Sequence, residues 1–184
     1  MIIGLVGMTA TGKTEIAKCL EEYGLKKIVT TTTRPMRPGE IEGIDYNFVS
    51  DNKFNKMKNN HEFLETTSYN TAYGIWQYGT PISSLKDDGV IILNPDGAKV
   101  FKKLNYINSK LFLIQASEGV IRNRLRFRKD TEEEANRRII ADKHDFKNVD
   151  KLVDFSIRNE GDMTPEMVAH IIFEIYKLYK KEET

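Results

Sequence analysis

The sequence predicts an α/β fold in which a mainly parallel central sheet lies between layers of helices. Short apolar runs alternate with amphipathic stretches along most of the chain, which is typical of strands joined by crossover helices. A glycine-rich loop separates the first apolar run from the first amphipathic stretch, the order in which such a sheet usually begins. With 184 residues the chain is long enough for one buried core, so we expect a single domain over 1–184.

Five apolar runs are the candidate strands of this sheet. They are Ile2–Val6, Lys27–Val29, Val90–Leu93, Leu111–Gln115 and Leu152–Ile157. Helices are expected in most of the gaps between them, as parallel neighbouring strands require.

Capping residues mark the expected helices. The helices are 13–23, one that begins after Ser117, 131–141, and one that begins at Thr164. Gly24 ends the first, and Thr131 with Glu134 has the spacing of a capping box. The buried face of the last helix is expected to consist of Met167, Val168, Ile171, Ile172 and Ile175.

Residues Gly7–Thr14 read G-M-T-A-T-G-K-T and follow the apolar run directly. Gly7 and Gly12 permit the backbone to curl, so that several N–H groups converge at the start of the next helix. Lys13 can reach the outer phosphates of a nucleotide, and the hydroxyl of Thr14 can bind Mg2+. This pattern predicts a P-loop NTPase fold. The expected triphosphate contacts are Gly7, Met8, Thr9, Ala10, Thr11, Gly12, Lys13 and Thr14.

The amino-acid composition limits the classes of binding partner that we expect. Lys and Arg number 28 against 27 Asp and Glu, a net charge of +1, so we expect no nucleic-acid or membrane partner. Any anion must be bound by local arginines. Cys19 is the single cysteine, which excludes an intrachain disulfide. The short apolar N-terminus has no basic segment before it, and we expect a cytoplasmic protein.

The segment 30–85 is too long for a crossover connection and predicts an inserted subdomain. Arg34 and Arg37 flank a proline-containing turn that can hold two guanidinium groups for a phosphate. Tyr46 can add a neutral hydroxyl donor to the same group. Solvated turn residues are the alternative for both arginines, and the segment alone leaves it open.

The segment 122–138 is rich in arginine and has the character of a lid hinge between two helices. Mobile cations that close over a phosphoryl group in transfer stabilise its charge and exclude water. The candidates are Arg124, Arg128 and Arg138. Ordinary ion pairs are the alternative for this region, and they would join Arg126, Lys129 and Arg137 to Glu132, Glu133 and Glu134.

Five segments carry a family resemblance that extends over nearly the whole chain. Residues 31–50 read T-T-T-R-P-M-R-P-G-E-I-E-G-I-D-Y-N-F-V-S, 62–65 read E-F-L-E, and 78–81 read Y-G-T-P. Arg124-Leu125, Arg128 and Arg138-Ile139 follow the pattern R-L-x-x-R and R-[LI], and 154–159 read D-F-S-I-R-N. Together these segments resemble the guanylate kinase family.

The resemblance implies ATP and Mg2+ at the phosphate loop and GMP or dGMP in the inserted subdomain. It implies that Arg34, Arg37, Tyr46 and Tyr78 hold the acceptor phosphate, that Thr30, Glu65, Gly79, Thr80 and Asp96 surround the guanine, and that Asn159 contacts adenine. The chemistry of Glu65 agrees, because a carboxylate can accept from both N1–H and the 2-amino group of guanine, and adenine has neither donor.

The same resemblance divides the chain into three parts. These are a core over 1–29, 86–121 and 139–184, a nucleoside-monophosphate-binding subdomain over 30–85, and a helical lid over 122–138. Three departures stand out: the chain between Glu65 and Tyr78 is longer than the family pattern, Asn94 stands where the pattern has an acid, and the lid is shorter than the pattern after Arg128. Another phosphate acceptor therefore remains an alternative. A non-catalytic protein-binding module is a second, and the protein is expected to be a monomer or a homodimer.

Overall fold

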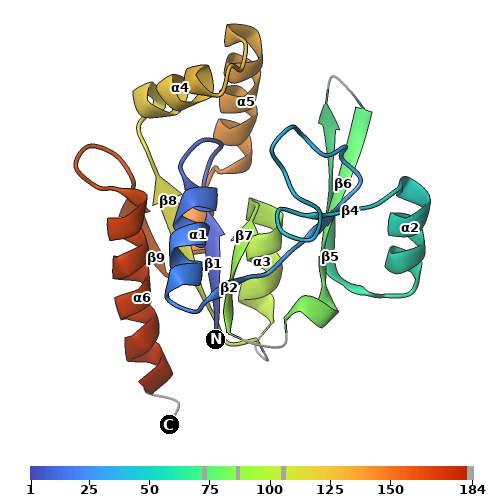
Figure 1. The fold of residues 1–184 in the computed structure, drawn as a ribbon, viewed down its shortest axis with the longest axis horizontal. Coiled ribbons are helices and arrows are strands. Elements are labelled where there is room, and N and C mark those ends of the chain that lie inside the picture. Colours follow the sequence, from blue (N-terminus) through green and yellow to red (C-terminus); the bar gives the residue numbers. More distant parts are fainter. Residues whose placement is uncertain (72–73, 86–87, 105–106, 182–184) are drawn as a thin grey trace.

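A computed structural model describes residues 1–71, 74–85, 88–104 and 107–181, and its central feature is a parallel sheet (Figure 1). The strands are β1 (Ile2–Val6), β2 (Lys26–Lys27), β7 (Gly89–Leu93), β8 (Ser109–Gln115) and β9 (Phe155–Arg158). They lie in the order β2-β7-β1-β8-β9, and each neighbouring pair is parallel. The predicted fold class is confirmed.

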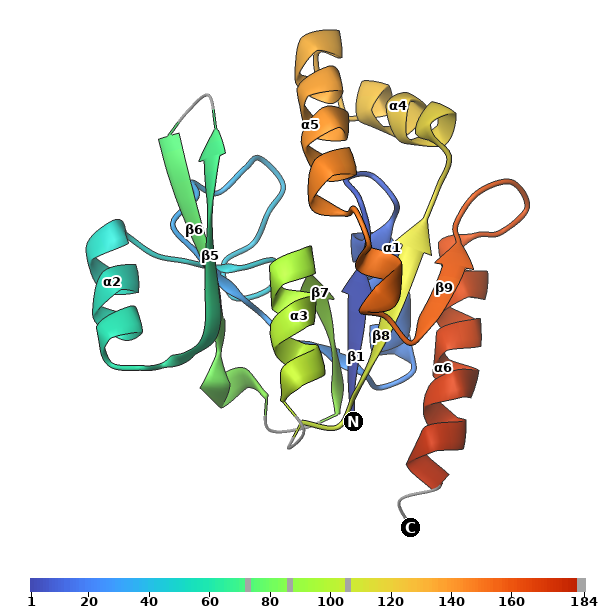
Figure 2. The same cartoon turned by 180° about the vertical axis from the view of Figure 1, so that it is seen from behind.

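Alternate residues of β1 face opposite layers of helices. Ile3 and Leu5 belong to a core cluster that packs on α1 (Lys13–Glu22) and α6 (Pro165–Lys181). Ile2 and Val6 belong to the cluster on the other face, where α3 (Pro95–Lys103) lies. Figures 1 and 2 show these helices on the two sides of the sheet, so the molecule has three layers.

A helix that the pattern did not indicate follows β7. Asn94 caps α3 with a side-chain oxygen that accepts from the Gly97 N–H at 2.7 Å, and Pro95 occupies the first turn. Asn followed by Pro is a strong helix start, because proline has no N–H to leave unpaired there.

Two predicted strands have different bounds in the structure. The strand expected over Leu152–Ile157 begins only at Phe155, because a 3-10 turn, η2 (Val149–Lys151), occupies the chain just before it. The strand expected over Lys27–Val29 is β2, and it ends at Lys27.

The prediction for the buried face of α6 is partly wrong. Val168, Ala169 and Ile172 are buried, whereas Met167 is 49% exposed and Ile171 is 38% exposed. The helix packs against α1, and residues on the flanks of its apolar stripe remain in contact with solvent.

Two helices, α4 (Glu118–Phe127) and α5 (Glu132–Asp145), project beyond the sheet at the end where the phosphate loop lies (Figures 1 and 2). Ser117 precedes α4 without a side-chain cap, and its N–H donates to Glu160 instead. Thr131 caps α5 by accepting from the Glu134 N–H at 3.2 Å, which is one half of the expected capping box. The helix runs four residues beyond the expected end at Ala141, to Asp145.

A second sheet lies beside the core and is formed by the middle of the chain (Figure 1). Its strands are β3 (Thr31–Thr32), β4 (Asn47–Phe48), β5 (Phe63–Thr71) and β6 (Gly74–Pro81), in the order β4-β3-β6-β5. Helix α2 (Asp51–Asn59) covers it through Phe54, which is fully buried and stacks on Phe63. The 3-10 turn η1 (Ile82–Ser84) leads back towards the core. No helix within the described ranges is long and apolar enough to cross a membrane.

Candidate functional site

The phosphate loop joins β1 to α1 in a conformation that L-residues rarely adopt. Gly12 has φ +97° and Ala10 has φ +55°, so both lie in the left-handed region. A Cβ on Gly12 would lie 2.2 Å from the Asn159 side-chain nitrogen, so only glycine fits there without movement. The loop therefore has the curled backbone that the sequence pattern predicts.

Two side chains brace this loop from behind. The amide of Asn159 is fully buried and donates to the Thr11 carbonyl at 2.8 Å. Arg124 on α4 donates to the Ala10 carbonyl at 3.1 Å and to the Asn159 carbonyl at 2.8 Å. The sequence assigned Asn159 to adenine and Arg124 to the lid; in this structure both hold the loop, and Asn159 presents no surface to a ligand.

Lys13 is folded back into the loop. Its ammonium donates to the carbonyls of Gly7 at 2.6 Å and Met8 at 2.8 Å. Burial of the ammonium lowers the pKa of Lys13 to about 8, although the nearby carboxylate of Asp142 opposes this effect. A ligand phosphate would replace the carbonyls as the partner of this group.

Asp142 on α5 is a carboxylate that the sequence analysis did not place at the site. Its Oδ2 accepts from the backbone N–H of Thr9 in the phosphate loop. Burial raises the pKa of Asp142, and the Thr9 N–H and the Lys13 ammonium act in the opposite direction. No local pattern marks this residue, because only the packing of α5 over the loop brings it there.

One cavity of about 970 Å³ joins the phosphate loop to the second sheet. Gly7, Thr9 and Lys13 line one end of it. The opposite end is lined by residues of the second sheet and its loops, which include Thr30, Arg34, Arg37, Tyr46, Glu65, Tyr78, Gly79 and Thr80. The structure thus brings together the residues that the resemblance assigns to two different ligands.

Glu65 and Thr80 form a polar pair at the acceptor end. They lie opposite each other on β5 and β6, and the Thr80 hydroxyl donates to Glu65 Oε1 at 2.7 Å. Burial raises the pKa of Glu65, while the bond from Thr80 lowers it. A half-buried carboxylate aimed into a cavity is a suitable acceptor for a donor pair such as that of guanine.

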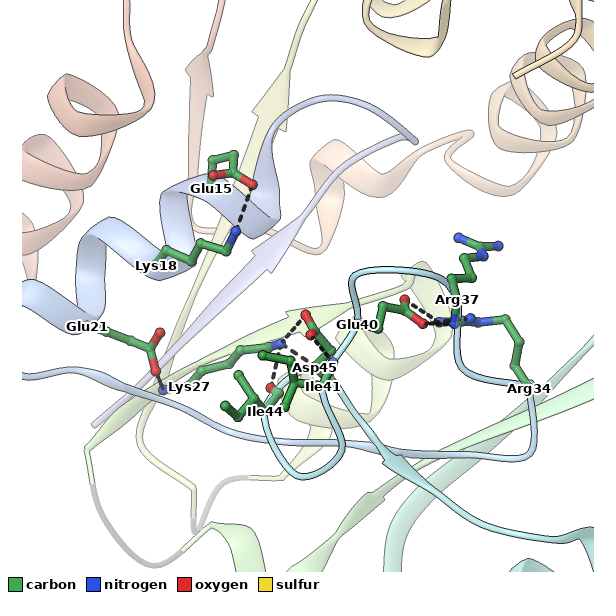
Figure 3. A network of polar contacts seen from close by, with 10 residues as sticks. All are labelled: Glu15, Lys18, Glu21, Lys27, Arg34, Arg37, Glu40, Ile41, Ile44 and Asp45. Carbon is green, nitrogen blue, oxygen red and sulfur yellow. Dashed lines mark hydrogen bonds and ion pairs between the residues drawn. The ribbon is translucent and has the colours of Figure 1, made fainter. Parts of the chain in front are cut away.

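A carboxylate holds the arginine turn, as Figure 3 shows. Glu40 accepts from both terminal nitrogens of Arg34, at 2.6 and 3.0 Å, and from the backbone N–H of Arg37 at 2.7 Å. Burial raises the pKa of Glu40, but these hydrogen bonds outweigh it and lower the pKa overall. Arg34 is only 6% exposed, so the sequence alternative of a solvated turn residue is wrong for it; Arg37 is exposed.

Aromatic rings complete this end of the cavity. The guanidinium of Arg34 lies 5.4 Å from the ring centre of Tyr46, and the Tyr46 ring meets the Tyr78 ring edge-on at 6.0 Å. Lys27 on β2 ties the same loop to the core, since its ammonium donates to the carbonyls of Ile44 at 2.9 Å and Asp45 at 3.1 Å (Figure 3).

The arginines of the segment 122–138 line cavities, form ion pairs, or do both. Arg128 and Arg138 line a second cavity of about 640 Å³ together with Thr14, Arg34 and Arg37. Arg138 also pairs with Glu134 at 2.7 Å and with Asp130 at 3.4 Å. Arg137 and Arg126 pair with Glu134 and Glu132, as the ion-pair interpretation expects.

Asp96 is a predicted guanine contact that the structure places away from the cavity lining. It lies in the first turn of α3, its side chain is 68% exposed, and it pairs with Lys99 at 2.7 Å. The start of a helix at Asn94 turns this carboxylate towards solvent. Asn94 and Pro95 line the cavity in its place.

The fold and the two-ended cavity define a P-loop kinase. The family model described as guanylate kinase matches residues 1–174. Similar proteins include a guanylate kinase of Sulfurimonas denitrificans, 31% identical over 87% of this chain and 80% of that protein, and one of Thermus thermophilus, 30% identical over 91% of this chain and 77% of that protein. The chain belongs to the guanylate kinase family.

Comparison with solved structures agrees with this family assignment. A crystal structure of guanylate kinase from Anaplasma phagocytophilum has a TM-score of 0.75 and 25% identity, and the match covers 97% of this chain and 85% of that one. Shikimate kinase from Acinetobacter baumannii in complex with shikimate has a TM-score of 0.57 at 12% identity over 97% of this chain and 94% of that one. At that identity the likeness concerns the fold alone.

Proposed function

We propose that this protein transfers the γ-phosphate of ATP to GMP or dGMP and releases ADP with GDP or dGDP. The observation that carries the proposal is the single cavity that has Lys13 at one end and the Glu65–Thr80 pair at the other. A phosphate cradle and a guanine-reading carboxylate facing one space are the parts that such a transfer needs.

Binding of the acceptor follows from the geometry of the second sheet. Glu65 accepts from the N1–H and 2-amino groups of guanine, and Thr80, with Thr30 nearby, orients that carboxylate. Arg34, Arg37, Tyr46 and Tyr78 donate to the acceptor phosphate. Because Glu40 already fixes Arg34, that guanidinium is ordered before the acceptor arrives.

Binding of the donor follows from the phosphate loop. The N–H groups of the loop and the ammonium of Lys13 bind the β- and γ-phosphates. Mg2+ fits this site, since Thr14 lines the cavity beside the phosphate loop and a hydroxyl oxygen is a suitable ligand for an ion that usually takes few protein ligands beside phosphate oxygens and water. When bound, the ion would neutralise charge on the transferred group.

No general base is needed, because the acceptor phosphate is already ionised and nucleophilic at pH 7. Catalysis then consists of alignment, neutralisation of charge by Lys13, and closure by Arg128, which directly follows α4, and by Arg138 on α5. We propose that 122–138 acts as this lid and 30–85 as the acceptor subdomain. One chain supplies both ends of the cavity, so a monomer suffices.

The free thiol of Cys19 is compatible with a reducing compartment, and we place the activity in the cytoplasm.

The deciding experiment is a coupled ADP-release assay with the complete set of ribo- and deoxynucleoside 5′-monophosphates. We expect GMP and dGMP to be used far better than AMP, CMP, UMP or dTMP. Preference for another acceptor would reject the assignment of Glu65, and binding of a phosphopeptide without ATP consumption would favour a non-catalytic module.

A further inference from the structure

Two departures from the family pattern meet in space. The long hairpin of β5 and β6 carries Tyr69, and the segment after β7 begins with Asn94. The Asn94 side-chain amide donates to the Tyr69 hydroxyl at 2.7 Å. This bond joins the second sheet to the end of a core strand, so the lengthened hairpin contacts the residue that replaces the expected acid.

Tyr69 continues a ladder of side chains that faces the cavity. Successive pairs across β5 and β6 are Glu65 with Thr80, Thr67 with Tyr78, and Tyr69 with Trp76. All six line the cavity, as expected for alternate residues on one face of a hairpin. The first pair reads the base under the proposed function, and the second supplies Tyr78 to the phosphate. The third is the pair that no assignment covers.

Ring contacts connect the third pair to the arginine turn. The rings of Tyr69 and Tyr78 meet edge-on at 5.6 Å, and those of Tyr78 and Tyr46 do so at 6.0 Å. Arg34 lies over the Tyr46 ring at 5.4 Å. A displacement of Tyr69 is therefore passed through packed rings to the guanidinium that would bind the acceptor phosphate.

We propose that Tyr69, held by Asn94, is a positioning residue that fixes the acceptor-phosphate group of Tyr78, Tyr46 and Arg34 relative to the phosphate loop. The inference rests on the proposed function. Asn94 can hold Tyr69 in this way because its side-chain oxygen accepts a hydrogen bond from the Gly97 N–H at 2.7 Å, which fixes the direction of its side-chain amide nitrogen. The end of β7 thus determines the position of the β5–β6 hairpin.

The bond is suited to orientation rather than to stability. Tyr69 is 37% exposed, and a hydrogen bond open to water adds little to the free energy of folding. Transfer of a phosphoryl group depends steeply on alignment, so a small shift of the acceptor reduces the rate.

The test uses the full-length protein and two mild variants. Tyr69→Phe keeps the ring and removes the hydroxyl; Asn94→Ser keeps a helix-capping oxygen and removes the amide donor. For each we expect kcat with GMP to fall by about tenfold, with the KM for ATP and the thermal midpoint near wild-type values. Tyr23→Phe is the matched control, since it removes a hydroxyl that contacts His170 far from the cavity.

A double-mutant cycle separates a bridge from two independent effects. If Tyr69 and Asn94 act through one bond, Tyr69→Phe in the Asn94→Ser background has no further effect on kcat. Trp76 is the only tryptophan of the chain and the cross-strand partner of Tyr69, so its fluorescence reports GMP binding at this pair. We expect its GMP-dependent change to be smaller in Tyr69→Phe.

Additive effects on kcat, or unchanged kcat in Tyr69→Phe while the wild type phosphorylates GMP, would overturn the positioning role and leave the proposed function intact. A wild-type protein that does not phosphorylate GMP would instead reject the proposed function.

Discussion

The two ends of the cavity are built in different ways. At the donor end, the phosphate loop is one continuous segment between β1 and α1, fixed by left-handed backbone at Gly12 and by carbonyls that hold Lys13. At the acceptor end, Arg34 is fixed by the side chain of Glu40, and its neighbours Tyr46 and Tyr78 come from separate strands and loops. The phosphate-binding groups of the first end come from one local segment, which Asn159 and Arg124 brace, whereas the second end is an assembly of distant side chains.

This difference predicts how a mutation impairs each end of the cavity. A change in the phosphate loop acts on the binding of a triphosphate directly, because the loop itself supplies the donors. A change in the second sheet acts through the packing that gathers the acceptor residues. The expected effects of mutation should therefore separate into losses of chemistry at one end and losses of assembly at the other.

The largest effect is expected from Lys13→Ala. Its ammonium is the loop cation that faces the cavity, and its loss should lower kcat by about 10³-fold or more, since a preorganised charge at the transferred group is removed. Steady-state kinetics with GMP would measure the loss of kcat, and thermal unfolding would show whether the stability of the variant is changed. Lys18→Ala is the control on the same helix, because its exposed pair with Glu15 contributes little. Similar turnover in both variants would contradict the role of Lys13.

The acceptor end should fail through packing in Phe54→Ala. Phe54 is fully buried and stacks on Phe63 at 4.6 Å, outside the clusters that surround the parallel sheet. We expect a loss of about 3–5 kcal/mol in the stability of the second sheet. GMP binding should then be lost with ADP binding retained, as measured by calorimetry. In Phe112→Ala, which opens the main core, both should be lost; equal loss in the two variants would show that the ends are not separable.

Local patterns predicted the donor end, and tertiary packing explains what they missed at the acceptor end. Gly7–Thr14 could be predicted because a strand, a loop and a helix follow one another within a few residues. Glu65 and Tyr78 could be placed in one site only by resemblance, since their strands pair through a long hairpin. Asp142 could not be predicted, because its contact with the Thr9 N–H depends on how α5 lies over the loop.

The fold was predictable to a similar degree. The parallel sheet follows from the apolar runs, and it is confirmed. The helix after Asn94 was missed because the segment was read against a family pattern with an acid, although Asn-Pro is itself a helix start. Met167 and Ile171 were expected inside because apolar periodicity gives the direction of a helix face but not its width.

A smaller and more selective effect is expected from Glu65→Gln. The amide keeps one acceptor oxygen but presents N–H groups to a guanine donor, so kcat/KM for GMP should fall by about 10²-fold while the KM for ATP stays unchanged. Burial raises the pKa of Glu65, so its carboxylate becomes protonated as the pH falls towards that pKa. The KM of the wild-type protein for GMP should therefore increase at low pH, and the Glu65→Gln variant should lack this pH dependence. Glu62→Gln is the exposed control, and an equal loss for ATP and GMP would reject the assignment.

The smallest effect concerns the pH dependence of ATP binding. With a pKa of about 8 in the free protein, Lys13 is charged below that pH and must take up a proton above it when a triphosphate binds. The affinity should be flat below about pH 8 and fall towards tenfold per pH unit above it, with proton uptake visible by calorimetry in two buffers. The carboxylate of Asp142 raises the pKa of Lys13, so Asp142→Asn should move the break to lower pH. A break that stays in place in this variant would show that the two groups do not interact.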